Sequence, residues 1–195
     1  GAVAFIFTAP PVANTSTFSD LSYALNFNMD VDAPKIFGTN GTYTVAPMTF
    51  MTPPDPTNLS TLKNRGAKLI VYHGTSDPVF SFNDTARWYE GLQSANGGDA
   101  SNFARLFPVP GMNHCSGGPA TDQFDMVDAM VKWVEQGTAP ATVTATARGA
   151  GAFAVNTDVP AGWAANRTRP LCPYPKVARY NGSGSLELAS SFSCQ

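Results

Sequence analysis

The fold class is decided by the stretch AKLIVYHGTSDP, residues 67–78. Its first six residues form a continuous, mostly apolar run of strand length, which is typical of a strand buried on both faces of a parallel sheet. A short polar loop that contains Asp77 follows the run. The stretch therefore predicts a buried strand that carries a carboxylate just beyond its carboxyl end.

The chain repeats this arrangement downstream. Residues 103–109, FARLFPV, predict a second strand, and GMNHC at residues 111–115 follows it. Between the strands, Ser81 and Asp84 have the spacing of a capping box, and apolar residues then recur at helical spacing until Gly97 and Gly98. Strand, helix and strand in this order predict an α/β fold with a parallel sheet and crossover helices.

A further helix is predicted from Asp122 to Gln136. Its apolar residues recur at three- and four-residue intervals, and its charged residues form a second stripe. Gly137 can occupy the position just beyond the last helical residue. We expect the apolar stripe to face the core; it consists of Phe124, Val127, Val131 and Val134.

Asp77 and His114 each lie a few residues beyond a predicted strand. Chemistry in open parallel sheets collects at the carboxyl ends of the strands, so we expect these side chains to lie within hydrogen-bonding reach. A carboxylate that orients an imidazole, which in turn moves a proton, is the acid and base pair of a catalytic triad. The chain order Ser, Asp, His is that of α/β-hydrolases. No Gly-x-Ser-x-Gly elbow occurs in the 195 residues, so the nucleophile is missing from the pattern.

Other interpretations of the same residues are open. Asp77-Pro78 is also a common start of a turn, and His114 is also compatible with a role as an ordinary loop residue. His73, Asp77, His114 and Cys115 are all ligand types for zinc, although they lack the spacing of a structural zinc motif. Ser116 is a poor nucleophile candidate, because a nucleophile elbow needs a small residue two positions before the serine and His114 occupies that place.

Composition excludes several classes of function. The chain is 43% hydrophobic, which suffices for one core, and only 13% charged with a net charge of −2. This balance offers no basic surface for nucleic acid. The longest apolar runs fall far short of the roughly 20 residues that span a bilayer, so we expect no membrane segment.

Three zones differ in composition. Residues 1–62 are rich in proline and predict loops with short helices, residues 63–137 form the strand and helix core, and residues 138–195 form a tail. Cys172 and Cys194 could close a loop in this tail, as disulfides do in secreted or periplasmic proteins. Cys115 is then left as an inert buried thiol, a free thiol, or a cysteine whose partner lies on other sequence.

Three segments resemble the tannase and feruloyl esterase family: residues 68–80, 109–119 and 167–175. The resemblance extends from about residue 19 to the end of the chain. It implies the C-terminal part of an α/β-hydrolase with a doubly wound sheet, in which residues 1–62 are the end of the lid and the return to the sheet. The implied activity is hydrolysis of carboxylic esters of aromatic acids through an acyl-enzyme.

The resemblance also implies roles for individual residues. Asp77 and His114 match the acid and base of the triad, and Phe80 matches an aromatic residue that packs over the ring of the substrate. Cys115 matches a cysteine bonded to the residue just before the nucleophilic serine, and Cys172 and Cys194 match a disulfide near the C-terminus.

The remaining parts of the family pattern are expected outside this sequence. The serine, the oxyanion-hole donors, most of the lid and the calcium site of the lid would lie on an N-terminal segment or chain of the same enzyme. We therefore expect no metal or cofactor in this chain, little activity from it alone, and a secreted or periplasmic location. The alternative is a non-catalytic fragment, a binding or scaffold module that keeps the hydrolase shape.

Overall fold

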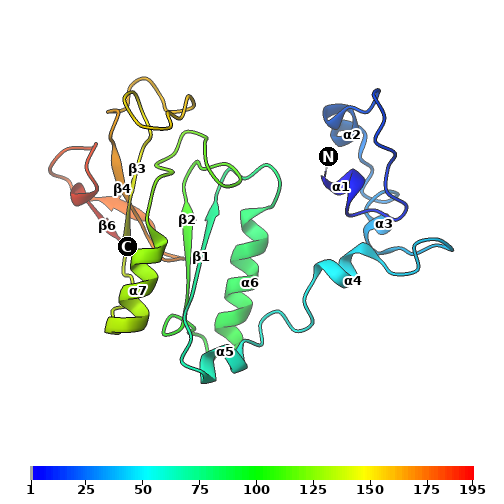
Figure 1. The fold of residues 1–195 in the computed structure, drawn as a ribbon, viewed down its shortest axis with the longest axis horizontal. Helices are drawn as coiled ribbons and strands as arrows, with labels where there is room; N and C mark the ends of the chain where they lie inside the picture. Colours follow the sequence, from blue (N-terminus) through cyan, green and yellow to red (C-terminus); the bar gives the residue numbers. More distant parts are fainter. Residues whose placement is uncertain (1) are drawn as a thin grey trace. The chain divides into compact units, whose positions relative to one another are not determined.

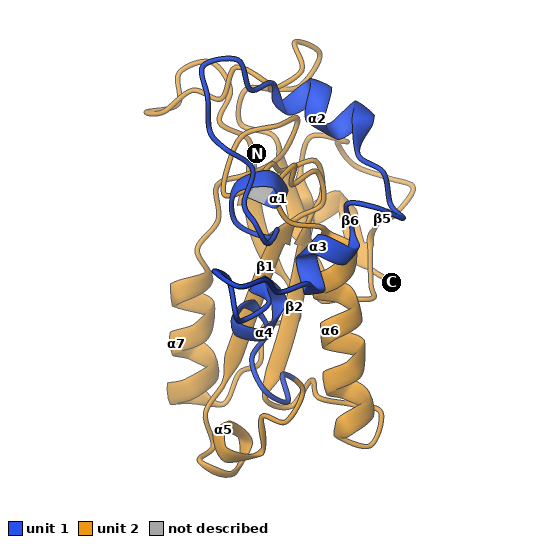
Figure 2. Ribbon diagram, turned by 90° about the vertical axis from the view of Figure 1, so that its right-hand side faces the viewer, with its two compact units in different colours: residues 1–56 blue, residues 57–195 orange. Residues whose placement is uncertain are grey.

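The computed structural model describes residues 2–195 and divides into two compact units, residues 1–56 and 57–195 (Figure 2). The first unit contains only short helices joined by loops. Proline is the first residue of two of them, where its missing N–H costs no hydrogen bond. The helices are α1 (Ala2–Phe5), α2 (Asp20–Asn26), α3 (Pro34–Phe37) and α4 (Pro47–Met51).

The second unit is built around a parallel pair of strands. Helix α5 (Ser60–Asn64) precedes β1 (Leu69–Gly74), which pairs in parallel with β2 (Ala104–Val109) along its full length. Helix α6 (Phe82–Ala95) is the crossover, and α7 (Met126–Gln136) follows β2. The two helices lie on opposite sides of the strand pair (Figures 1 and 2). The predicted order of strand, helix, strand and helix is therefore confirmed.

Strand β2 separates two hydrophobic clusters. Leu106 and Phe107 are both fully buried, and they belong to different clusters because neighbouring residues of a strand point to opposite faces. The cluster with Leu106 contains Tyr89 and Leu92 of α6, and the cluster with Phe107 contains residues that follow α7. Each cluster anchors one layer of the fold to the strand pair.

Strand β1 is less buried than its sequence predicts. None of its residues 69–73 is fully buried, and the Tyr72 side chain is 49% exposed. The expectation of burial on both faces is wrong for this chain, because within the described residues β1 has a hydrogen-bonded neighbour on one edge alone.

The two helices differ from expectation in detail. Ser81 is the N-cap residue of α6, but its side chain makes no capping hydrogen bond, so the predicted capping box is wrong. In α7 the N-cap is Asp125, which accepts a hydrogen bond from the Asp128 N–H at 2.8 Å. Gly137 has the left-handed conformation expected beyond the last turn, with φ 68°.

The prediction of which face of α7 packs against the core is also wrong. Val127 and Val134 are 73% and 60% exposed, and Val131 is 41% exposed, whereas Trp133 is 3% exposed. Met126 and Ala129 pack against the core instead. The helix has two apolar faces, and the periodicity alone selected the wrong one.

The tail forms two antiparallel strand pairs. Strand β3 (Val143–Thr146) pairs with β4 (Thr168–Leu171), and β5 (Ala178–Tyr180) pairs with β6 (Phe192–Cys194) next to the short helix η1 (Ala189–Ser191). Cys172 and Cys194 form a disulfide, as the sequence suggests. Among residues 2–195, no helix has the length and hydropathy needed to cross a bilayer.

Candidate active site

Asp77 lies in the loop that leaves the carboxyl end of β1. Its Oδ1 atom accepts hydrogen bonds from the backbone N–H groups of Val79, at 2.7 Å, and Phe80, at 3.0 Å. Its Oδ2 atom accepts a hydrogen bond from Nδ1 of His114 at 2.8 Å. The two oxygens therefore have separate tasks, because Oδ1 fixes the carboxylate to its own loop and Oδ2 holds the imidazole.

The Asp77 side chain is only 4% exposed. Burial alone would raise the pKa of this carboxyl, but the hydrogen bonds from His114, Phe80 and Val79 outweigh it and lower the pKa to about 2. Asp77 is therefore an anion at neutral pH. Because a carboxylate can only accept, Nδ1 of His114 carries the proton of their hydrogen bond.

His114 lies in the loop that follows β2, at the same sheet edge as Asp77. A network of hydrogen bonds holds this loop: the N–H of Gly117 donates to Asp122, at 2.7 Å, and the N–H of Gly118 donates to Asp158, at 2.9 Å. The Arg148 guanidinium donates two further bonds to the Asp122 carboxylate. The tail thus supports the loop that carries the imidazole.

Two close approaches require glycine near His114. A Cβ atom at Gly74, the last residue of β1, would collide with the carbonyl groups of Met112 and Asn113. Gly118 has φ 74° and lies against the carbonyl of Gly111. These contacts let the end of β1 and the His114 loop lie close enough for the 2.8 Å bond to form.

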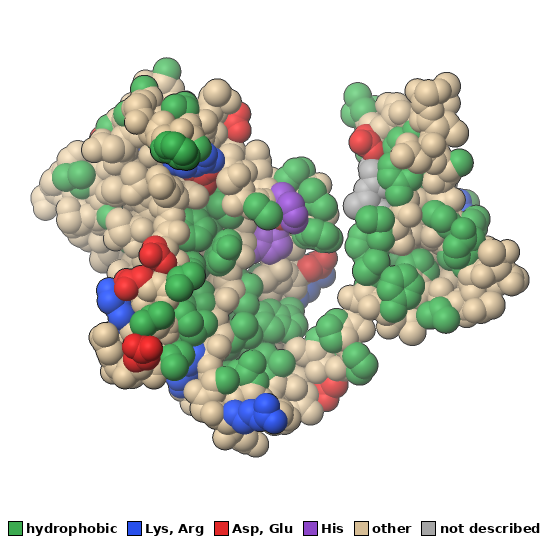
Figure 3. All heavy atoms as spheres, viewed as in Figure 1, with side chains coloured by type: hydrophobic (Ala, Val, Ile, Leu, Met, Phe, Trp, Pro, Cys, Tyr) green, Lys and Arg blue, Asp and Glu red, His purple; other side chains and the backbone are tan. Residues whose placement is uncertain are grey.

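The His114 ring is accessible. Its side chain is 48% exposed, and because Asp77 occupies Nδ1, the atom left for proton transfer is Nε2. The Phe80 ring lies beside it, with 5.3 Å between ring centroids, and Phe80 is itself 47% exposed. An open cavity of about 380 Å³ adjoins Phe80 and is lined by Thr75 and residues 77–83. Figure 3 shows the histidine surface bordered by hydrophobic side chains.

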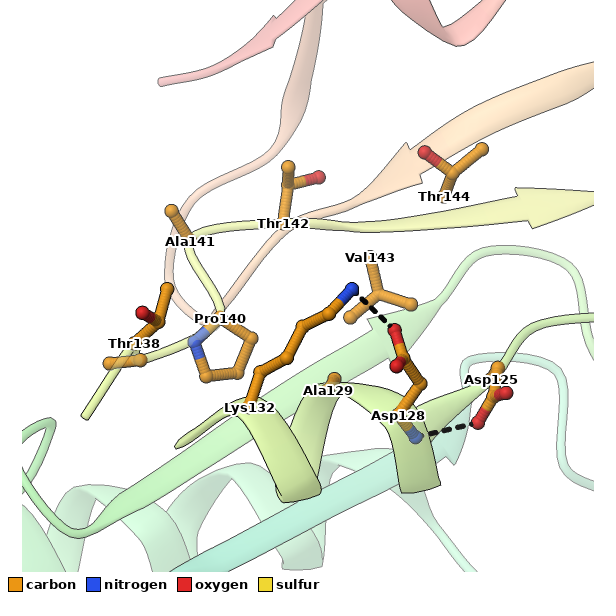
Figure 4. A pocket seen from close by; sticks show the side chains of 11 residues that line it. Asp125, Asp128, Ala129, Lys132, Thr138, Pro140, Ala141, Thr142, Val143 and Thr144 are labelled. Atoms are coloured by element: carbon orange, nitrogen blue, oxygen red, sulfur yellow. Dashed lines mark hydrogen bonds and ion pairs between the residues drawn. The ribbon is translucent and has the colours of Figure 1, made fainter. Parts of the chain in front are cut away.

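Another cavity, of about 480 Å³, lies between α7 and the segment that enters β3 (Figure 4). Its charged residues already have hydrogen-bond partners, since Lys132 donates to Asp128 at 2.7 Å and Asp125 accepts from the Asp128 N–H at 2.8 Å. Thr138 and Thr144 are among its polar lining residues, and it contains neither an imidazole nor a thiol. The chemistry therefore points to the Asp77 and His114 edge rather than to this cavity.

The zinc interpretation gains no support from the arrangement. Within residues 2–195, no three side chains of His, Cys, Asp or Glu converge as a metal ion requires. His73 and His114 do lie near each other, but both are directed at the Asp77 carboxylate. Cys115 is exposed and has no disulfide partner within this chain, so the interpretation of Cys115 as an inert buried thiol is wrong.

Several supporting residues were not predicted to act at this site. The sequence suggests His73 only as a metal ligand, yet its Nε2 atom lies 3.2 Å from Asp77 Oδ2. Arg148 and Asp158 come from the tail, 34 and 44 residues beyond His114 in the sequence, and no local pattern marks them. Such contacts become visible only when the fold brings distant segments together.

Comparisons with known proteins identify the family of the chain. The family model described as tannase and feruloyl esterase matches residues 5–195, nearly the whole chain. The chain belongs to the tannase and feruloyl esterase family. A mono(2-hydroxyethyl) terephthalate hydrolase of Piscinibacter sakaiensis is a relative within it, 48% identical over 170 residues, which are 87% of this chain and 26% of the relative.

Further members are fungal. A probable feruloyl esterase of Arthroderma benhamiae is 36% identical over 141 residues, which cover 70% of this chain and 24% of the relative. The crystal structure of feruloyl esterase B from Aspergillus oryzae, 25% identical, superposes with a TM-score of 0.60 over 87% of this chain and 34% of that structure. An esterase from the same organism covers the whole chain with the same TM-score, and at 21% identity it shows the fold. The chain spans about a quarter of the length of the curated tannase and feruloyl esterase relatives that it matches.

Proposed function

We propose that this chain supplies the acid and the base of a serine carboxylic ester hydrolase that acts on esters of aromatic acids. The observation that carries the proposal is the 2.8 Å hydrogen bond between Asp77 Oδ2 and His114 Nδ1, which leaves Nε2 of His114 at an accessible surface. Family membership supports ester hydrolysis as the reaction.

The proposed chemistry has two halves. In the first, His114 Nε2 takes the proton of a serine hydroxyl as its oxygen attacks the ester carbonyl carbon, and then gives that proton to the departing alcohol. In the second, Nε2 takes a proton from water, which attacks the acyl-enzyme, and returns it to the serine as the carboxylic acid leaves. Asp77, ionised throughout, stabilises the imidazolium that forms in each half.

The aromatic part of the proposal rests on Phe80. Its half-exposed ring lies beside the imidazole and lines the 380 Å³ cavity, where a flat ring of a substrate can pack against it. The names of the relatives, feruloyl esterase and mono(2-hydroxyethyl) terephthalate hydrolase, agree with an aromatic acyl group.

The serine is proposed to lie on an upstream segment or chain of the same enzyme, together with the oxyanion-hole donors, most of the lid and a lid calcium site. Cys115 would bond to the residue before that serine. The chain would then be the C-terminal part of an α/β-hydrolase, with residues 1–62 as the end of the lid and the return to the sheet. The Cys172–Cys194 disulfide supports a secreted or periplasmic location.

The test is the variant His114→Ala in the complete protein. Turnover of an aromatic ester should fall by about 10⁴-fold or more, because no other group can move the serine proton. Glu135→Ala, an exposed change on α7, is the matched control and should leave turnover unchanged. Unchanged turnover in His114→Ala would reject the proposal and favour a non-catalytic binding or scaffold role.

A further inference from the structure

Both histidines of the chain approach the same carboxylate oxygen. His114 donates to Asp77 Oδ2 at 2.8 Å, and Nε2 of His73 lies 3.2 Å from the same oxygen. The His73 side chain is 13% exposed, so it is far less accessible to a substrate than His114. The triad chemistry uses one imidazole, and the second needs its own explanation.

The neighbours of His73 determine which of its nitrogens carries the proton. Nε2 lies 3.2 Å from the carbonyl oxygen of Phe80 as well as 3.2 Å from Asp77 Oδ2, and both of these atoms can only accept. Nε2 must therefore be protonated. Nδ1 lies 2.8 Å from the hydroxyl oxygen of Thr85 on α6, which can donate to it. The surroundings thus select the neutral Nε2–H tautomer.

The position of His73 is fixed on every side. Its backbone belongs to β1, its Nδ1 atom is held by α6 through Thr85, and the Phe82 ring packs edge-on at a centroid distance of 5.9 Å. The Nε2–H group then reaches the first and last residues of the turn 77–80. Backbone N–H groups hold this turn at Asp77 Oδ1, and the His73 side chain contacts both of its ends.

We infer that His73 is a positioning residue of this esterase site: it clamps the turn 77–80 between Thr85 and Asp77, and so aims Asp77 Oδ2 at His114 and holds the backbone of Phe80. The inference rests on the proposed function, since it assigns to His73 the support of the proposed acid and of the proposed aromatic contact.

The charges around Asp77 allow the effect of His73 to be measured in the pH dependence of kcat/KM. The ionisable side chains in contact with Asp77 are His73 from β1 and His114 from the loop after β2. Helix α6 contributes the neutral Thr85 here, while Asp84 and Arg87 pair with each other on its exposed surface. Removing the His73 N–H leaves more negative charge on Oδ2, which favours the imidazolium form of His114. The acidic limb of kcat/KM should then move to higher pH.

The first measurement is the tautomer of His73 in the complete protein labelled with ¹⁵N-histidine, with the signals assigned through His73→Gln. Long-range ¹H–¹⁵N spectra at neutral pH should show Nε2 protonated and Nδ1 unprotonated. A His73 ring protonated at Nδ1 alone would overturn the inference. This measurement needs no turnover, so its result is independent of whether the enzyme hydrolyses esters.

The second measurement is the pH profile of turnover for His73→Leu and His73→Gln. His73→Leu should lower kcat by about 10- to 100-fold, as loss of alignment does, and shift the acidic limb to higher pH. His73→Gln, whose amide N–H falls near the position of Nε2–H, should recover most of both effects. A variant that merely loosened the fold would lose activity without moving the limb.

Thr85→Val tests the other side of the clamp. It should change the proton distribution of the His73 ring and lower kcat, whereas Thr144→Val, the same change at an exposed position of β3, should alter neither. Wild-type kinetics in both His73 variants would overturn the inference. If the wild-type enzyme itself fails to hydrolyse aromatic esters, the proposed function fails. The measured tautomer of His73 still shows whether its Nε2–H group donates to the turn 77–80.

Discussion

At the scale of single residues, one buried carboxylate organises the site. Asp77 receives backbone N–H groups on one oxygen and two imidazoles on the other, so its charge is compensated although its side chain is 4% exposed. A buried anion is stable only with such partners. The same hydrogen bonds that keep Asp77 ionised also determine where His114 lies, so a change that weakens them should affect both the charge and the position of these residues.

The variant Asp77→Asn separates the charge from the shape. We expect turnover by the complete enzyme to fall by about 10⁴-fold, because the amide permits the wrong His114 tautomer and cannot stabilise an imidazolium.

The charge of Asp77 also affects stability. The folded-state pKa of Asp77 is lowered to about 2, so the carboxylate stabilises the fold above about pH 4. This contribution is lost as the pH falls from about 4 towards about 2.

Urea unfolding at a series of pH values checks this pH dependence of stability. The difference in unfolding free energy between the wild type and Asp77→Asn should shrink as the pH falls from about 4 towards about 2. Other carboxylates titrate in both proteins and cancel in the difference. A difference that did not depend on pH would show that Asp77 is not held as an anion by these contacts.

At the scale of elements, the sequence missed the four strands of the tail but predicted β1, β2, α6, α7 and the sheet edge that brings Asp77 and His114 together. Those features follow from local signals: apolar runs, glycine stops and the parallel order of strands. It could not select the buried face of α7, because Val127, Val131 and Val134 form one apolar stripe and Met126, Ala129 and Trp133 form another. Contacts with β-strands distant in sequence decide between them, and local periodicity contains no information on those contacts.

The His114 loop depends on the tail in a way that Arg148→Ala should reveal. Asp122 is fully buried at its side chain, and the Arg148 guanidinium that compensates it is 20% exposed. Burial alone would raise the pKa of Asp122, but the hydrogen bonds from Arg148 and Gly117 prevail and lower it. Removing Arg148 leaves a buried charge unpaired, which typically costs about 3–5 kcal/mol of unfolding free energy.

Denaturant unfolding measures this cost. Arg148→Lys keeps the charge but loses the two-pronged bond and should fall between the wild type and Arg148→Ala. Arg87→Ala is the control, because the Arg87 side chain is 77% exposed and its pair with Asp84 is loose, at 3.5 Å. Equal effects of Arg148→Ala and Arg87→Ala would show that the Asp122 network does not support the loop.

The tail itself is held by the disulfide between Cys172 and Cys194. The bond joins residues 22 apart in the sequence, and a loop of this length restricts the unfolded chain by an amount worth about 3 kcal/mol. The double variant Cys172→Ala/Cys194→Ala should lose about that much stability in thermal or denaturant unfolding. A loss well below 1 kcal/mol would show that strand pairing alone closes the tail.

At the scale of the whole molecule, the chain holds the hydrogen-bonded pair Asp77 and His114, the proposed acid and base, but no sequence for a nucleophile elbow. It also exposes the valine stripe of α7 and one edge of β1 within the described residues. Relatives about four times as long supply room for the missing parts, since the chain spans 26% of the terephthalate hydrolase. The proposed ester hydrolysis therefore depends on a serine that reaches His114, which we propose lies on an upstream segment or chain of the same enzyme.

Cys115 offers a way to detect the segment that carries the proposed serine. It is exposed, next to His114, and without a disulfide partner in the chain, so a bond from it to the residue before the serine would tie the nucleophile to the base. The complete protein, purified without reductant, should yield a Cys115 peptide cross-linked to the serine-bearing segment. If that segment is a separate polypeptide, reduction should release it in the intact mass spectrum.

The variant Cys115→Ser is the control, since it should lose this cross-link while the Cys172–Cys194 bond persists. Turnover should fall with it, because the His114 loop and the serine are then aligned by non-covalent contacts alone. The contrary result is a Cys115 peptide recovered with a free thiol from active, unreduced protein. In that case the serine would reach His114 through packing against the strand edge and the valine stripe, and changes on those surfaces, rather than at Cys115, would control assembly of the triad.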